Sequence, residues 1–296
     1  MFIDIHVHSR KKPIMWRGTS YYTSPETLIE RYDEIGVEKA VLLPGVNPEC
    51  SHQVGSTDEM LEICEMYPGR FIPFCNIDPR AVSNSPFAPI DELLFIYKEK
   101  GCRGIGEVCA NLPFTHPLYL NLFRCVEKVG FPLTFHIAPQ IGNFYGIYDD
   151  PGLPGLEYCL NIYPNLIFLG HSQPFWAEIA ELEKPYDRYI YPDYPVRKEG
   201  VVPKLMRKYK NLYGDLSAGS GHNALARDLN YAVDFLNEFQ DRLLFGTDIC
   251  APKTPTPLVD LLLKLKEEGK ISETVFNKIA RENAIKLLQL EGKDEK

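Results

Sequence analysis

The chain has 296 residues and a formal net charge of −8, from 32 Lys and Arg against 40 Asp and Glu. This length suffices for one large domain with a buried core, so we expect a single domain over 1–296. The negative charge argues against nucleic acid as a partner, because phosphate binding depends on clustered Lys and Arg. No apolar stretch reaches the roughly 18 residues that a membrane helix needs.

The amino terminus and the cysteines indicate where the protein works. Residues 2–8 predict a strand, with no basic segment followed by an apolar run of the kind found in targeting signals. The eight cysteines are scattered without a CxxC pair, and several lie in apolar, strand-like segments. Reduced thiols in a cytoplasmic protein explain this distribution better than a disulfide framework.

Short apolar runs alternate with amphipathic stretches along the chain, which is typical of repeated βα units. Ser24 is expected to cap a helix that begins at Pro25 and ends near Ile35. The other predicted helices cover 58–66, 90–100, 117–129, 155–163, 223–239, 257–268, 272–281 and 283–290. The predicted strands cover 2–8, 39–43, 70–76, 102–108, 132–137, 166–171, 211–217 and 242–248.

Eight such units favour a closed (β/α)8 barrel, an α/β fold of the TIM-barrel type, over an open doubly wound sheet. A doubly wound nucleotide-binding sheet would need a glycine-rich turn after the first strand, and none is present. The segment 172–200 is long and rich in Pro and Tyr, and connections of that length usually build or cover a site.

Six residues that can bind a metal stand at the carboxyl ends of predicted strands. In a barrel these ends meet at one face, where the active site lies. Taken singly, each residue could have a purely structural role; Asp248, for instance, could simply be the N-cap of a helix. Together they predict one catalytic metal site with mixed nitrogen and oxygen ligands, suited to zinc and also compatible with manganese, iron or cobalt. The six are His6, His8, Glu107, His136, His171 and Asp248.

The order of these residues resembles the amidohydrolase superfamily of metal-dependent TIM barrels. The likeness extends over nearly the whole chain, and it is closest to the amidohydrolase-2 branch, which includes aminocarboxymuconate-semialdehyde decarboxylases. The GIGEV segment is also similar to TatD-like hydrolases. The segments that carry the resemblance are FIDIHVH, GIGEV, PLTFHIAP, IFLGHSQ, LLFGTD and ENAIKLLQL.

The resemblance implies a role for each ligand. His6, His8 and Asp248 would hold a first divalent metal, with His136 as a further ligand. Glu107 stands where relatives have a carboxylate or a carboxylated lysine that bridges two metals. His171 would bind a second metal or, in one-metal relatives, would polarise the substrate or shuttle a proton. One or two ions, most simply zinc, are therefore expected.

The expected reaction is hydrolysis of an amide, ester or lactone bond in a small molecule by a metal-activated water. Asp248 would act as the proton acceptor, and the metal or a protonated His171 would polarise the carbonyl group. The main alternative is a lyase that decarboxylates an aromatic or unsaturated acid without oxidation. An inactive metal-binding barrel and a TatD-like nuclease are less favoured. A homodimer is compatible with each of these functions.

Substrate contacts are harder to predict from the sequence. Aromatic residues follow strands one, five and six, and Tyr145 and Trp176 are candidates to line a pocket for a ring-bearing molecule. Arg17 and Arg10 both lie on the loop after the first strand and could pair with a substrate carboxylate. Asp215 ends strand seven and could support a neighbouring ligand. We leave His52, His116 and His222 outside the metal set.

Overall fold

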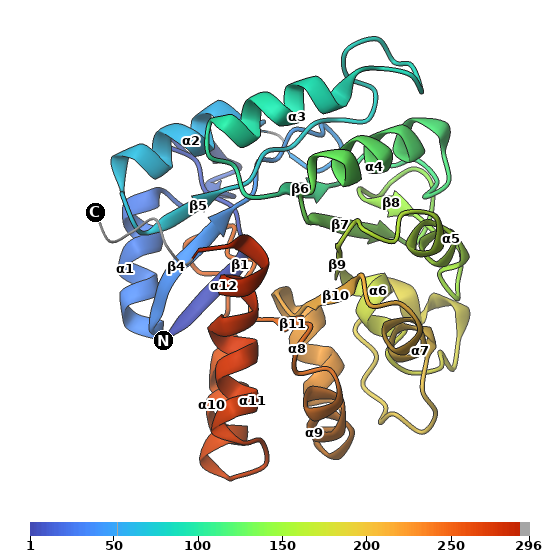
Figure 1. The fold of residues 1–296 in the computed structure, drawn as a ribbon. Helices are drawn as coiled ribbons and strands as arrows, with labels where there is room; N and C mark the ends of the chain where they lie inside the picture. The colour runs from blue at the N-terminus through green and yellow to red at the C-terminus, as the bar shows by residue number, and fades with distance from the viewer. Residues whose placement is uncertain (52, 291–296) are drawn as a thin grey trace.

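The computed structural model describes residues 1–51 and 53–290. Within these ranges eight parallel strands form the centre of the molecule and helices surround them (Figure 1). Two ladders, β1–β4–β5 and β6–β7–β9–β10–β11, are joined by bridges between Cys75 and Ile105 and between Val7 and Ile249. These bridges close the ring, so the predicted (β/α)8 barrel is confirmed. The barrel strands are β1 (Phe2–Val7), β4 (Val37–Leu42), β5 (Phe71–Pro73), β6 (Ile105–Val108), β7 (Leu133–Ala138), β9 (Phe168–His171), β10 (Leu212–Asp215) and β11 (Leu243–Leu244).

The helices follow the predicted pattern closely, except for the segment 223–239. Ser24 accepts from the backbone of Thr27 as the N-cap of α1, as expected. The single helix expected over 223–239 is instead two helices, because Asp228 caps a new helix by accepting from Tyr231. The helices are α1 (Pro25–Ile35), α2 (Thr57–Met66), α3 (Ile90–Glu99), α4 (Pro117–Val129), α5 (Pro154–Ile162), α7 (Val201–Lys208), α8 (Ala218–Ala226), α9 (Leu229–Glu238), α10 (Pro257–Glu267), α11 (Glu273–Asn277) and α12 (Asn283–Leu288), with a π-helical turn at Lys278–Glu282.

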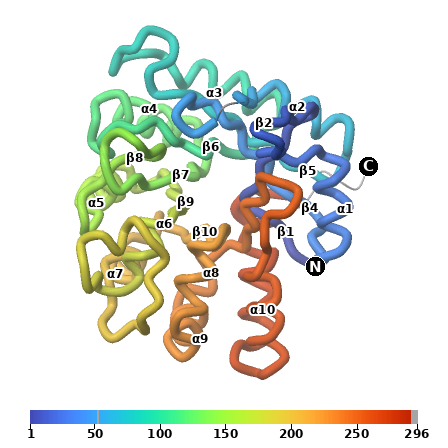
Figure 2. The backbone as a smooth tube through the Cα atoms, turned by 180° about the vertical axis from the view of Figure 1, so that it is seen from behind, coloured from blue at the N-terminus to red at the C-terminus, as the bar shows by residue number. Residues whose placement is uncertain are grey.

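The long connection after β9 contains structure that the sequence did not reveal. It forms α6 (Gln173–Ala177) and a 3-10 turn, η1 (Pro185–Tyr189), before α7 begins. The turn packs against α6, and the yellow segment between them can be followed from both sides (Figures 1 and 2). Short pairings elsewhere join β2 (Met15–Trp16) to β3 (Thr19–Ser20) and β8 (Ile147–Tyr148) to β7.

The hydrophobic core has two parts, as a barrel requires. One lies between the strands and the helices, and the other fills the barrel interior. Ala284 and Leu288 of α12 pack against the interior cluster. That cluster includes Ile3, Ile5, Val41, Leu43, Ile72, Phe74, Leu169 and Leu244. No helix in the described ranges has the length and apolar character needed to cross a membrane.

Candidate metal centre

The first pair of candidate ligands faces the barrel interior because β1 is irregular. Ile3 and Ile5 point into the interior core, and strict alternation would then turn His6 outward. The register between β1 and β4 shifts between Asp4 and Val7, so the alternation is broken there. His6 and His8 both reach the site, with 3.2 Å between their Nε2 atoms. The predicted convergence of the two histidines is confirmed.

The Nδ1 atoms of both histidines have acceptors that fix the orientation of the rings. His6 donates to Asp215 Oδ2 over 2.6 Å, and His8 donates to the Leu43 carbonyl over 3.0 Å. With Nδ1 protonated, each Nε2 presents its lone pair to the site, which is how histidine ligands of metals are usually held. The expected supporting role of Asp215 agrees with this geometry.

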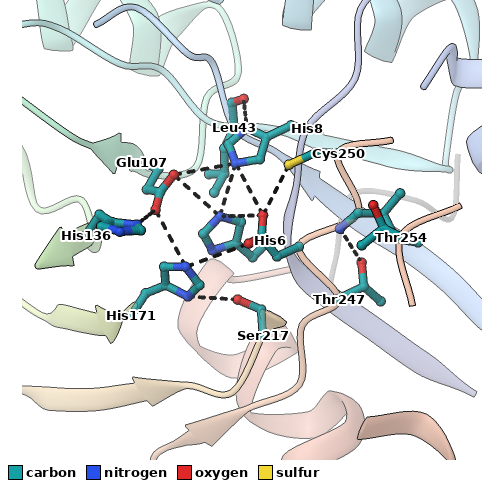
Figure 3. Close-up of polar contacts among 12 residues, drawn as sticks. His6, His8, Leu43, Glu107, His136, His171, Ser217, Thr247, Cys250 and Thr254 are labelled. Atoms are coloured by element: carbon teal, nitrogen blue, oxygen red, sulfur yellow. Dashed lines mark hydrogen bonds and ion pairs between the residues drawn. The ribbon is translucent and has the colours of Figure 1, made fainter. Parts of the chain in front are cut away.

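Glu107 lies between two sets of histidines (Figure 3). Its Oε2 is 3.5 Å from His8 Nε2 and 3.8 Å from His6 Nε2. Its Oε1 is 2.7 Å from His136 Nδ1 and 3.6 Å from His171 Nε2. One carboxylate therefore presents a separate oxygen to each histidine pair.

Asp248 completes the first set from the loop after β11. Its Oδ1 lies 3.6 Å from His6 Nε2 and 3.7 Å from His8 Nε2, whereas its Oδ2 lies 3.9 Å from His171 Nε2. The residue has a left-handed backbone, with φ of 53°, and its N–H donates to the His6 carbonyl. A non-glycine residue in this conformation is uncommon and is often found at functional sites.

The electrostatics of the site favour an added positive charge. Burial lowers the pKa of His6, but Asp215, Asp248 and Glu107 outweigh it and raise the pKa to about 10. Burial together with His6 lowers the pKa of His171 to about 4. Convergent nitrogen lone pairs and carboxylates in a buried site fit a divalent cation.

The candidate ligand atoms form groups compact enough to hold a metal. Their donor atoms lie within 4.8 Å of one another in each group. The groups, taken from the described residues, are His6–His8–Asp248, Glu107–His136–His171 and His6–His171–Asp215. All six predicted ligands are therefore brought together.

A cavity of about 230 Å³ opens beside this cluster. His136, His171 and Asp248 form part of its wall, and Tyr145 lies with its ring 4.5 Å from that of His136. A smaller cavity of about 70 Å³, also lined by Tyr145, reaches His8 and Glu107. Tyr145 thus lines both cavities beside the cluster, and its role as a substrate contact stays a prediction.

The other three candidate substrate contacts lie elsewhere. Arg17 is exposed on the β2–β3 hairpin and lines neither cavity. Arg10 is fully buried, where it donates to the carbonyls of Ser9 and Gln53. Trp176 belongs to the core: its indole N–H donates to the Asp215 carbonyl over 2.8 Å. The short helix α6, which the sequence does not predict, carries Trp176 into the core.

The core position of Trp176 predicts a large loss of stability on truncation. Trp176 is 1% exposed and packs against Phe175 and Phe235. We expect Trp176→Ala to lower the free energy of unfolding by about 3–5 kcal/mol, because it leaves a cavity and an unpaired carbonyl. Urea titration followed by circular dichroism measures this. The matched control is Trp16→Ala on the exposed hairpin, for which we expect about 0.5 kcal/mol; equal losses in the two variants would contradict the assignment.

Because Asp215 orients His6, replacing Asp215 should lower the affinity for metal although the six predicted ligands all remain. Asp215→Asn keeps the side-chain shape but replaces the acceptor that holds Nδ1–H of His6. We expect zinc affinity to fall about 10–100-fold, as for other residues that support metal ligands. Competition with a chromophoric chelator measures the affinity. Affinity within threefold of the original protein would show that Asp215 does not orient His6.

Several functional neighbours were not found from the sequence. Ser217 Oγ lies 2.9 Å from His171 Nδ1, and Arg188, Tyr189 and Tyr191 line the larger cavity. Their contacts depend on how the loops after β9 and β10 fold, for which no local pattern gives a signal. Of the histidines left out, His116 caps α4 and His222 lies in α8, while His52 is outside the described residues.

Comparison with protein families supports the resemblance seen in the sequence. Residues 198–290 match the family model Amidohydro_2, described as amidohydrolase. The matched part begins shortly before α7, extends to the end of the described chain and includes Asp215 and Asp248. The resemblance to the amidohydrolase-2 branch is thereby confirmed. A search of proteins with curated functions finds no match.

Solved structures with the same fold cover nearly the whole chain. An uncharacterised TIM-barrel protein from Bordetella bronchiseptica is 17% identical, with a TM-score of 0.64 over 97% of this chain and 98% of that one. A probable 2-pyrone-4,6-dicarboxylic acid hydrolase from Acinetobacter baumannii is 15% identical, with a TM-score of 0.58 over 97% and 99%. The 2,6-dihydroxybenzoate decarboxylase from Rhizobium is 17% identical, with a TM-score of 0.60 over 98% and 99%. At these identities the likeness establishes the barrel fold.

Proposed function

We propose that the protein is a metal-dependent hydrolase that holds two divalent ions and cleaves an amide, ester or lactone bond in a small molecule. The observation that carries the proposal is the position of Glu107, with Oε2 toward His6 and His8 and Oε1 toward His136 and His171. A carboxylate shared in this way suits a pair of ions. Zinc is the ion that this mixed nitrogen and oxygen donor set favours.

The side chains around the metal site have separate roles in the proposed hydrolysis. A bound divalent metal supplies Lewis acidity and lowers the pKa of water to roughly 7. Asp248 accepts the proton of the attacking water at Oδ2, which faces away from the His6–His8 pair, and returns it to the leaving group. Tyr145 and His171 line the cavity where the carbonyl group of the substrate would lie.

The cavity limits the size and kind of substrate. Its volume of about 230 Å³ suits a molecule with a single ring. Phe144, Tyr145, Tyr189 and Tyr191 give it several aromatic walls. The net charge of −8 also opposes a nucleic acid substrate. Each of the eight cysteines, all within the described residues, is a free thiol, which supports a reducing, cytoplasmic location.

Decarboxylation of an aromatic acid is the second candidate. It is favoured by the aromatic walls of the cavity, against which a flat ring would lie beside His171 and Asp248. In this reaction a side chain must deliver a proton to the ring carbon that loses carbon dioxide. The shared carboxylate between two histidine pairs gives no advantage to that step, so hydrolysis is preferred.

One set of measurements tests the function and separates the two reactions. Elemental analysis of protein loaded with zinc should give close to two ions per chain. Dihydrocoumarin, phenyl acetate, acetanilide and 2,6-dihydroxybenzoate are then incubated with the loaded protein. Proton release with one of the first three supports hydrolysis, whereas carbon dioxide release from the last supports decarboxylation. Failure to retain any metal would overturn both.

A further inference from the structure

A separate cavity of about 180 Å³ lies at the amino-terminal end of the barrel, opposite the metal centre. The turns that lead into β5 and β6 and the first part of β4 and β5 form its wall. We call it the basal cavity. It is several times larger than the roughly 30 Å³ that one water molecule occupies in the liquid, so a small organic molecule fits. The side chains in its wall are those of Lys39, Phe71, Ile72, Pro73, Arg103 and Leu290.

The charged part of this wall is entirely cationic. Lys39 and Arg103 line the basal cavity, and no acidic residue of the described chain lines it. Both cations are half-buried, where solvent screens charge less than it does in bulk water. In a chain with a net charge of −8, this is a local concentration of positive charge around a hollow. Such a hollow favours an anion.

The charged residues next to this wall in the sequence already have partners of opposite charge. Arg70 lies with Nη2 2.7 Å from Asp33 Oδ1. Glu38 lies with Oε2 3.2 Å from Arg281 Nη2. These acids are therefore engaged in ion pairs of their own, and they leave the charge of Arg103 uncompensated.

Arg103 is the polar group that most clearly points to a ligand. Its backbone N–H donates to the Pro73 carbonyl over 2.9 Å, which fixes the chain at this point. Its guanidinium forms no hydrogen bond or ion pair with any other residue that the structure describes. None of its unpaired nitrogen atoms is fully buried, so they can be reached from the cavity or from solvent. A guanidinium presents a planar set of donors that matches a phosphate or carboxylate.

The rest of the wall is apolar and belongs to the core. Phe71 and Ile72 are each 6% exposed, the first in the core beneath the helices and the second in the barrel interior. Pro73 and Leu290 are half-buried beside them. A ligand here would direct its charge to the two cations and an apolar body to this surface.

We propose that the basal cavity is a second binding site, which takes a phosphate monoester of a small apolar alcohol between Arg103 and Lys39. The two cations hold the phosphate group, and Phe71 and Leu290 contact the apolar part. The site is separate from the metal centre, and it does not depend on which reaction the metal centre catalyses. Free phosphate shares the charged part of this chemistry, so the experiment includes it as a separate probe.

Calorimetric titration of the metal-free protein with phenyl phosphate, inorganic phosphate and phenol tests the site. Removal of the metal leaves no ion that could bind a phosphate group. We expect phenyl phosphate to bind at least tenfold more tightly than either other probe, because it alone engages both parts of the wall. Arg103→Gln should reduce its affinity about 10–100-fold, and Lys39→Gln about tenfold, because a hydrogen bond to a charged group is lost. Arg103→Lys should lose less, since it keeps the charge.

The matched control is Arg17→Gln, which changes an exposed arginine outside the basal cavity and should leave the affinity for phenyl phosphate unchanged. Thermal unfolding shows that each variant is folded. Failure of the unaltered protein to bind phenyl phosphate would overturn the site. Affinity within threefold of the original in both Arg103→Gln and Lys39→Gln would do the same, because the ligand would then bind elsewhere. Equal affinity for inorganic phosphate would overturn the assignment to an ester. None of these results depends on metal content, which tests the hydrolase proposal separately.

Discussion

Glu107→Gln should lower the zinc content from two ions per chain to at most one and reduce turnover about 10³-fold. Glutamine has nearly the same shape, but it is neutral and has only one oxygen that can serve as a ligand. The change removes the charge that faces both histidine pairs, at 3.5 Å from His8 and 2.7 Å from His136. A bound metal supplies several kcal/mol of transition-state stabilisation, and each 1.36 kcal/mol is a factor of ten in rate.

Metal content after dialysis is measured by plasma mass spectrometry, and turnover is measured with the substrate that the panel identifies. Glu99→Gln is the matched control because Glu99 is exposed at the end of α3, outside both cavities. It should retain two ions and full turnover. Two tightly bound ions in the Glu107 variant would show that this carboxylate is not shared, and the two-metal proposal would then fail.

The fold could be predicted largely from the sequence because βα units have strong local signals. Apolar runs gave all eight barrel strands, and the helix 117–129 has the predicted bounds. The break between α8 and α9 was missed because Asp228, a good N-cap, lies within a continuous amphipathic pattern. In the same way α6 lies within the connection 172–200, whose Pro and Tyr content suggested a loop, and α7, which begins just after that connection, was not predicted. Whether such segments form helices depends on tertiary packing, which a local sequence pattern does not show.

The metal site was predictable for a geometric reason that applies to every barrel. Strand ends converge, so a histidine or an acid at a strand end identifies the site without knowledge of the loops. The substrate side of the site has no such rule. Trp176 and Arg188 lie in one connection, and only its fold turns the tryptophan into the core and the arginine into the cavity wall. Even in β1, the usual alternation of side chains between the two faces of a strand does not predict the direction of the His6 side chain, because the register shifts between Asp4 and Val7.

Asp248→Asn should reduce kcat about 10³-fold while KM stays within about threefold. Asparagine retains an oxygen that can face His6 and His8, but an amide cannot accept a proton from water at neutral pH. General acid–base groups contribute typically 10²–10⁴-fold, and Asp248 is proposed to act in both proton transfers. Asparagine also tolerates the left-handed backbone at this position, where φ is 53°, so the loop should be preserved.

Steady-state kinetics of the zinc-loaded variant separate the two parameters, and metal analysis shows whether both ions remain. Asp260→Asn is the control, since Asp260 is exposed on α10 and lines neither cavity. A kcat within threefold of the original, with metal retained, would exclude Asp248 as the proton acceptor. The acceptor would then have to be another group beside the cavity. His171 is the first candidate, because its Nε2 lies 3.9 Å from Asp248 Oδ2.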